Sequence, residues 1–261
     1  MSGKILKKRA SAAAITLIAA LLGGCPAFAD GLKVITGAGM AAPLRAIAAD
    51  FAKRSGFQVT VVSDTTGGVQ KRLESGEKAD LILVTSAVMD NLAKENLVAG
   101  PRADIARVMA GVAVKRGAPE PDISSSEAVK KSLLAAKSIS YVDPAAGGIT
   151  GPYFVALCRR LGILGQVAAK AVLKKTGGEV AAAVANGESE LGVTLVSEML
   201  SNPGISVAGP LPQEIQIDSV YVASLAKDVA NPEAAKKLLA QLRSVGGQTS
   251  IRTAGLIGIA Q

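Results

Sequence analysis

The sequence predicts an α/β fold in which mainly parallel sheets are flanked by helices. Short strand-like runs alternate with amphipathic stretches along the chain, and the connections between them are short. In the run over 80–84, every residue after Asp80 is aliphatic, so both faces are apolar, as in a buried parallel strand. With 261 residues, the chain is long enough for one or two domains with a large core.

The first part of the chain predicts two strand–helix units and a third strand. Residues 32–35 form a β-rich run that ends in the turn 37–39. A helix is expected next, because apolar residues recur at three- and four-residue spacing between Leu44 and Phe51, and Gly56 ends it. The other elements expected here are a strand over 58–62, a short helix that ends near 75, and the strand over 80–84.

The same alternation resumes at the apolar run 108–114, which a loop rich in glycine and proline follows. The segment from Ser124 to Glu127 fits a capping box and predicts the start of a helix. Asn231 and Pro232 are residue types preferred at the N-cap and first position of a helix. The other elements expected are a strand over 138–142, a glycine-rich turn over 143–151, and helices over 153–161, 179–185 and 231–243.

The first 29 residues have the features of a secretory signal peptide. A basic start is followed by an uncharged apolar run over 12–22 and by the small-residue site Ala27-Phe28-Ala29. The apolar run is shorter than the roughly 20 residues that an uncleaved membrane anchor needs. A second alternative is a lipoprotein acylated at Cys25, but Pro26 favours simple cleavage. We therefore expect cleavage after Ala29 and a periplasmic mature protein.

Composition excludes several classes of function. The formal net charge is +8, and four of the positive charges lie in the leader. The mild excess that remains forms no basic stripe with aromatic residues, so we expect no nucleic-acid partner; it suits a protein that binds small anions. Beyond the leader no apolar run is long enough to span a membrane, and we expect a soluble monomer.

The chain contains no histidine, which removes Ser-His-Asp catalysis and the usual zinc ligands. We therefore expect neither a metal site nor a cofactor, and an enzyme is less expected than a binding protein. Cys158 is the only cysteine after the leader, so it cannot form an intramolecular disulfide, and its apolar helical surroundings predict a buried thiol.

Four turns combine glycine with threonine or another small residue where a strand is followed by a helix. Helix N-termini expose N–H groups and a partial positive charge, and threonine hydroxyls add uncharged donors. In an open α/β sheet such turns gather at the carboxyl ends of the strands, where ligands bind. Each alone is also typical of an ordinary connection, and none fits a nucleotide-binding loop. Together they predict a site for a small anion. The turns lie at 36–40, 65–68, 147–151 and 176–178.

Four further segments resemble one family of exported proteins. They lie at 47–51, 73–81, 143–153 and 184–192. The chain after the leader resembles, over nearly its whole length, the periplasmic solute-binding proteins of the molybdate-binding type, which supply ABC transporters. The resemblance implies the two-lobed type II periplasmic-binding-protein fold and an ABC transporter permease as partner. It predicts a signal peptide over 1–29, a first lobe from 30–110 and 211–261, and a second lobe from 111–210.

The resemblance also implies ligand contacts, with departures from the family's pattern. Gly39 stands where the family has a serine, and Leu195 stands where a tyrosine commonly reaches the ligand. Thr66 occupies a second serine position and Thr150 an alanine position. The lost hydroxyls weaken the case for molybdate, so a di- or tricarboxylate fits as well as a molybdate-like oxyanion. The ligand-binding residues expected are Gly39, Met40, Thr65, Thr66, Gly67, Thr150, Gly151, Gly177, Gly178 and Leu195.

The chain is also similar to a branch of this family that includes aconitate isomerase. The alternative to anion capture for uptake is therefore an isomerase that interconverts cis- and trans-aconitate by allylic proton transfer. Candidates for the proton-transfer group are Asp64, Asp143 and Tyr153. Each has a structural reading as well, since the aspartates suit N-caps or turns and the tyrosine can cover the cleft. A third alternative is an exported adaptor with an inactive cleft.

Overall fold

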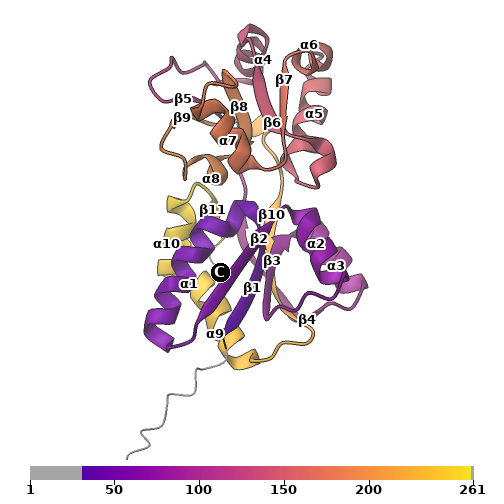
Figure 1. Cartoon of the computed structure of the whole chain (residues 1–261), viewed down its shortest axis with the longest axis vertical. Coiled ribbons are helices and arrows are strands. Elements are labelled where there is room, and N and C mark those ends of the chain that lie inside the picture. The colour runs from indigo at the N-terminus through magenta and orange to yellow at the C-terminus, as the bar shows by residue number, and fades with distance from the viewer. Residues whose placement is uncertain (1–30, 260–261) are drawn as a thin grey trace, which may run out of the picture.

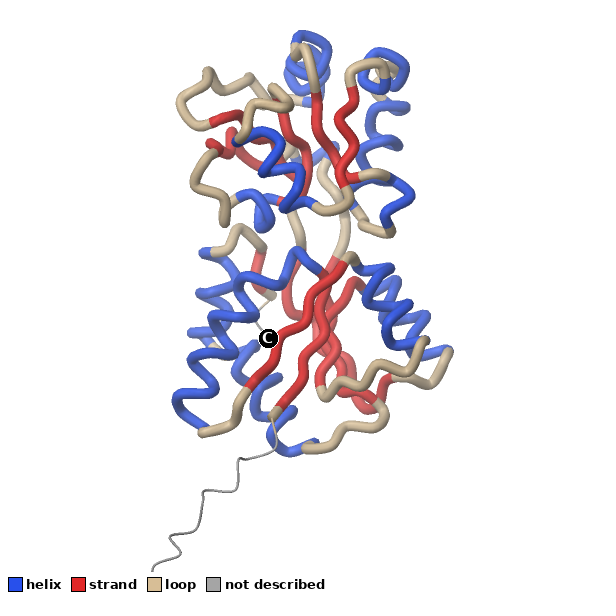
Figure 2. The backbone as a smooth tube through the Cα atoms, viewed as in Figure 1, coloured by secondary structure: helices blue, strands red, loops and turns tan. Residues whose placement is uncertain are grey.

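The computed structural model describes residues 31–259, which form two lobes stacked along the long axis of the molecule (Figure 1). Each lobe has one sheet with helices packed against it, as Figure 2 shows. The predicted α/β class and two-lobed architecture are therefore confirmed. The predicted signal peptide and its cleavage site lie outside the described residues. Within residues 31–259, no helix is both long and apolar enough to cross a membrane.

The first lobe is built on a six-stranded sheet with the order β11-β4-β10-β3-β1-β2. Its strands are β1 (Leu32–Gly37), β2 (Val59–Asp64), β3 (Leu81–Thr85), β4 (Val98–Arg107), β10 (Val220–Ala226) and β11 (Ile257–Gly258). Its helices are η1 (Ala38–Met40), α1 (Ala41–Ser55), α2 (Thr66–Glu74), α3 (Ser86–Lys94), α9 (Pro232–Arg243) and α10 (Val245–Thr253).

The second lobe is built on a five-stranded sheet with the order β7-β6-β8-β5-β9. Its strands are β5 (Ala110–Lys115), β6 (Ile139–Val142), β7 (Ala171–Lys174), β8 (Leu191–Leu195) and β9 (Ile205–Pro210). Its helices are α4 (Ser126–Ala135), η2 (Pro144–Ala146), α5 (Thr150–Arg160), α6 (Leu164–Ala168), α7 (Gly177–Ala185) and α8 (Val196–Met199). The short helix η3 (Gln213–Ile215) lies on the return to the first lobe.

Local signals in the sequence explain where several helices begin and end. Helix α1 stops at Gly56, which adopts a left-handed conformation with φ of 76°. The Ser125 side chain accepts the Ala128 N–H at the start of α4, and Asn231 caps α9 in the same way, directly before Pro232.

The chain crosses between the lobes twice, once between β4 and β5 and once between β9 and β10. The boundaries predicted at residues 110 and 210 fall beside these crossings. Strands β1, β2 and β3 are parallel, as are β6, β7 and β8, but β5 and β10 run antiparallel to their neighbours. Most strands of each sheet therefore run in one direction, as predicted, and β5 and β10, which run the other way, are the strands that arrive from the opposite lobe.

The hydrophobic core explains the apolar patterns seen in the sequence. Strand β3 is buried at every position, and Leu44, Ile47 and Phe51 of α1 pack into the same cluster of buried side chains. Cys158 on α5 is a buried free thiol, as its surroundings predict. The carboxyl ends of β1 and β3 thus leave the core at the edge of the first lobe that faces the second.

Candidate functional site

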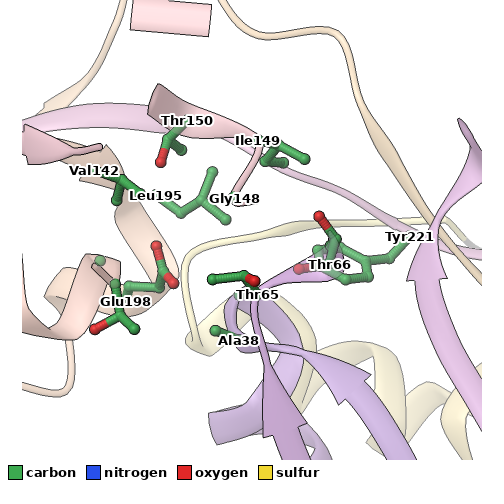
Figure 3. A pocket seen from close by; sticks show the side chains of 13 residues that line it. Ala38, Thr65, Thr66, Val142, Gly148, Ile149, Thr150, Leu195, Glu198 and Tyr221 are labelled. Atoms are coloured by element: carbon green, nitrogen blue, oxygen red, sulfur yellow. The ribbon is translucent and has the colours of Figure 1, made fainter. Parts of the chain in front are cut away.

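A pocket lies between the two lobes, where the carboxyl ends of the parallel strands meet (Figure 3). Its walls come from both lobes, and the close-up shows the two sets of side chains facing each other across the cavity. The first lobe contributes Ala38, Gly39, Thr65, Thr66 and Tyr221, and the second contributes Val142, Gly148, Ile149, Thr150, Thr176, Gly177, Leu195 and Glu198.

The pocket is small in this conformation. The space between its walls amounts to about 340 Å³, part of it open to solvent, and only about 30 Å³ can hold the centre of a water molecule. That is room for about two waters. A ligand larger than a few heavy atoms therefore requires the lobes to move apart.

Helix N-termini border the pocket on both sides. Helices α2, α5 and α7 begin at Thr66, Thr150 and Gly177, and each of these residues lines the cavity. A helix N-terminus presents N–H donors and a partial positive charge. None of the described residues that line the pocket is lysine or arginine. Attraction for an anion therefore comes from backbone dipoles and hydroxyl groups.

The threonine side chains are fixed by their position at these helix starts. Thr65 caps α2 by accepting the Gly68 N–H at 3.0 Å, and Thr176 caps α7 by accepting the Glu179 N–H at 3.2 Å. A hydroxyl that accepts from the backbone keeps its own hydrogen to donate. Thr66 is the first residue of α2 and Thr150 is the first residue of α5, and both threonines are buried. The glycine–threonine turns thus place hydroxyl donors on both sides of one cavity.

Leu195 and Gly39 meet across the lobes and close one side of the pocket. A Cβ atom on Gly39 would lie 2.5 Å from Leu195 Cδ1 and 3.1 Å from the Tyr221 hydroxyl oxygen. The glycine therefore provides the space into which Leu195 packs. With Val142 and Ile149, Leu195 gives the second lobe an apolar wall.

Tyr221 brings a phenol into the pocket from β10, a residue that sequence reasoning missed. Its side chain is 1% exposed, and a Cβ on Gly37 would approach its hydroxyl oxygen to 2.6 Å. Burial, followed by the nearby Glu198 carboxyl, raises the pKa of this phenol, so it stays protonated and can donate. The β-rich run Val220-Tyr221-Val222 is the local signal for this strand, but its place beside β3 depends on long-range pairing.

Glu198 on α8 is the second pocket residue that sequence reasoning missed. Its carboxyl oxygen Oε2 accepts a hydrogen bond from Thr194 Oγ1 at 2.8 Å. A Cβ on Gly177 would lie 1.9 Å from Oε2, so only glycine at the start of α7 leaves room for the carboxyl. Burial raises the pKa of Glu198, although the Thr194 hydrogen bond acts in the opposite direction. The only signal in the sequence is an acidic residue three positions after a buried strand.

The residues predicted to bind ligand divide into two groups in this structure. Those that line the pocket are Gly39, Thr65, Thr66, Thr150, Gly177 and Leu195. Those that do not line it are Met40, Gly67, Gly151 and Gly178. Met40 is fully buried in the first lobe, and a Cβ on Gly151 would collide with the Val142 carbonyl at 2.3 Å. Met40 and Gly151 therefore pack behind the pocket walls, whereas Gly67 contacts the opposite lobe at Gly147.

The three predicted proton-transfer candidates lie outside the pocket walls. The Asp64 carboxylate accepts the Thr65 N–H and forms an ion pair with Arg72 at 2.7 Å. Asp143 accepts the Ala145 N–H at 2.8 Å and caps η2. The Tyr153 hydroxyl donates to the Ile215 carbonyl. The two aspartates thus make capping and ion-pair contacts, whereas Tyr153 is hydrogen-bonded to η3 and does not line the pocket.

A backbone hydrogen bond joins the lobes beside the pocket. The Gly67 N–H donates to the Gly147 carbonyl at 2.9 Å, from the first turn of α2 to the turn before α5. A Cβ on Gly67 would lie 2.9 Å from that oxygen and 3.3 Å from Gly147 Cα. The backbones of the two lobes therefore approach each other closely at these two glycines. Among residues 31–259, no group of three or more acidic or cysteine side chains could hold a metal ion.

Comparisons with known proteins agree with this architecture. Residues 32–257 match the family described as bacterial extracellular solute-binding protein. An aconitate isomerase of Pseudomonas sp. is 31% identical over 231 residues, which are 86% of this chain and 87% of that protein. The molybdate-binding protein of Azotobacter vinelandii is 30% identical over 231 residues, with 84% of this chain and 87% of that protein covered.

Solved structures give the same picture of the fold. The periplasmic molybdate-binding protein of Azotobacter vinelandii superimposes with a TM-score of 0.73 at 19% identity. The superposition covers 88% of this chain and 100% of that chain. At this identity the match establishes the two-lobed fold.

Proposed function

Because this chain belongs to the bacterial extracellular solute-binding proteins, we propose that it captures a small anion between its lobes in the periplasm and delivers it to an ABC-type permease. The observation that carries the proposal is the pocket itself. N-termini of helices from both lobes and threonine hydroxyls converge there, and a lysine or arginine is absent from its described walls. Such a site binds negative charge through dipoles that folding has already oriented.

The ligand class follows from the kind of groups in the walls. Hydroxyl and N–H donors suit the oxygens of an oxyanion or a carboxylate, and Leu195, Val142 and Ile149 suit a short carbon skeleton. An oxyanion fits the present cavity with little movement, whereas a di- or tricarboxylate requires a wider separation of the lobes. Relatives at 31% and 30% identity include an aconitate isomerase and a molybdate-binding protein, so family membership supports both a carboxylate and a molybdate-like oxyanion.

A thermal-shift screen tests the proposal. The probes are molybdate, tungstate, sulfate, citrate, cis-aconitate and trans-aconitate, each added to the mature protein. A ligand present at about 100 times its Kd stabilises the native state by about 2.7 kcal/mol. We expect such a shift for at least one anion and a smaller shift in Thr150→Val. The matched control is Thr60→Val, because Thr60 is an exposed threonine on β2. The absence of a shift with every probe would contradict anion capture.

A second function, an isomerase acting on aconitate, is favoured by one specific observation. The pocket holds a carboxyl group, Glu198, whose pKa burial raises toward the range of an effective general base. In an allylic shift, the carboxylate removes a proton from the CH₂ carbon next to the double bond. The double bond moves by one carbon, and the same carboxyl returns a proton to the far carbon, so no oxidant or cofactor is consumed.

Direct assay separates the two functions. Purified protein is incubated with cis-aconitate, and trans-aconitate is measured over time. Turnover that Glu198→Gln abolishes while binding persists would support the isomerase. Turnover that is unchanged in Glu198→Gln, or an absence of turnover together with tight anion binding, would contradict this second function.

A further inference from the structure

We propose that Glu198 makes anion capture proton-coupled: when the pocket holds a fully ionised anion, the Glu198 carboxyl carries a proton and donates it in a hydrogen bond to the ligand. This inference rests on the proposed function, because it concerns the same pocket and assumes an anionic ligand. In this proposal, the protonation of one side chain determines the selectivity of the pocket among anions that differ in charge and in hydrogen-bonding capacity.

The argument begins with the charges around the cavity. Glu198 is the one carboxyl group in the described walls, and those walls contain neither lysine nor arginine. An anion in this cavity would lie against a carboxylate without a neutralising side chain. Like charges a few ångströms apart in a poorly solvated site repel strongly, and the arrangement that removes the repulsion is a protonated carboxyl.

The neighbours of Glu198 do not supply a compensating charge. Tyr221 on β10 is the other titratable group in the walls, and it is a neutral phenol. Of the elements packed around α8, helix α7 carries Glu179, which accepts the Lys175 N–H away from the cavity. Strand β5 ends in Lys115, an exposed residue outside the pocket walls, and η1, β8 and β9 carry no charged residue.

The Glu198 carboxyl accepts hydrogen bonds from the Thr194 hydroxyl and from the Leu195 N–H, and these two donors do not use all of its lone pairs. Oε2 accepts from Thr194 Oγ1 and packs on the start of α7 at Gly177. Figure 3 shows the Glu198 side chain directed into the cavity, toward the threonines of the first lobe. A proton on the carboxyl can therefore point at a ligand oxygen that the threonines also contact.

This assignment predicts a ligand class. A protonated carboxyl donates, as the threonine and tyrosine hydroxyls do, so the pocket suits an anion that only accepts hydrogen bonds. Sulfate, molybdate and fumarate have this character when fully ionised. An anion with its own donor could instead bind while Glu198 remains ionised.

Isothermal titration calorimetry between about pH 6 and pH 9 tests the proposal, with molybdate, sulfate and fumarate as probes, since their own charge stays nearly constant in this range. Above the pKa of Glu198 in the free protein, Kd should rise by up to about tenfold per pH unit. Titrations in buffers with different ionisation enthalpies should show uptake of up to about one proton per anion bound. Glu198→Gln should bind as tightly as the wild type at the lowest pH, and its Kd should not change with pH.

Glu179→Gln is the matched control, because it removes one negative charge from the adjacent helix outside the pocket walls. This variant should keep the pH dependence of the wild type. Binding without pH dependence, or a pH dependence that persists in Glu198→Gln, would overturn the proton coupling and leave anion capture standing. A lack of binding by all three probes, in both the wild type and Glu198→Gln, would overturn the proton coupling, and anion capture would fall as well only if citrate and both aconitates also gave no thermal shift.

Discussion

Replacing Gly67 by alanine should weaken ligand binding without weakening the fold. The added Cβ would lie 2.9 Å from the Gly147 carbonyl oxygen and 3.3 Å from Gly147 Cα. Because both atoms belong to the backbone, the lobes must separate by about half an ångström to restore an ordinary contact. That movement stretches the Gly67–Gly147 hydrogen bond and opens the pocket. The expected loss is about 1–2 kcal/mol, or about 5- to 30-fold in Kd.

The stability of the ligand-free protein should change in the opposite direction. Gly67 lies in the first turn of α2, and alanine is favoured over glycine in a helix by up to about 1 kcal/mol. Gly165→Ala is the matched control, since Gly165 also lies in a helix and a Cβ there would meet no atom within 4 Å. Calorimetric titration with the anion that gives the largest thermal shift, together with thermal unfolding of the free protein, measures both effects. Wild-type affinity in Gly67→Ala would refute closure through this contact.

Three further predictions concern single side chains. Thr66→Val and Thr150→Val should each raise Kd by an amount equivalent to about 1–3 kcal/mol, because a ligand oxygen loses its donor in a desolvated site. Titration calorimetry measures the change in Kd, and thermal unfolding of the free variants should show little change in unfolding temperature. For Glu198, burial raises the folded-state pKa above its ordinary value of 4.5, so the folded state loses stability as pH rises through 4.5 toward the folded pKa. Glu198→Gln should therefore unfold at a higher temperature than the wild type above pH 4.5, with a difference that shrinks at lower pH, as thermal unfolding in a pH series will show. Burial raises the pKa of Cys158 to about 12, so iodoacetamide at about pH 8 should leave the native thiol unmodified and alkylate it after unfolding in urea, as mass spectrometry will report.

Sequence reasoning was most effective where a local signal fixes the structure. Helices α1 and α9 have clear apolar spacing and recognisable ends at Gly56 and Asn231, and both form as expected. Strand β4 gave no comparable pattern, because Gly100, Pro101 and Arg102 interrupt it and most of its residues are exposed. Its place in the sheet depends on pairing with β10, which lies more than a hundred residues later.

The chemistry of the pocket was less accessible from the sequence than its turns were. Glycine and threonine at the ends of strands mark a possible anion site locally, so Thr65, Thr66 and Thr150 could be named in advance. Helix α8 has only four residues, too few to show a periodic pattern, and Glu198 enters the pocket because Gly177 of another helix leaves space for it. A contact of that kind is determined by tertiary packing, which single-sequence patterns do not contain.

Tyr221 and Leu195 illustrate the same limit. The resemblance to molybdate-binding proteins implies that a tyrosine hydroxyl is lost at Leu195, on the second lobe. The structure places another tyrosine in the pocket from the first lobe, paired through β10 with Thr85 of β3. The first lobe therefore carries hydroxyls of Thr65, Thr66 and Tyr221, while the second carries the Glu198 carboxyl with the hydroxyls of Thr150 and Thr176. Since the Tyr221 phenol and the Glu198 carboxyl come from different lobes, the complete set of pocket groups exists only when the two lobes meet.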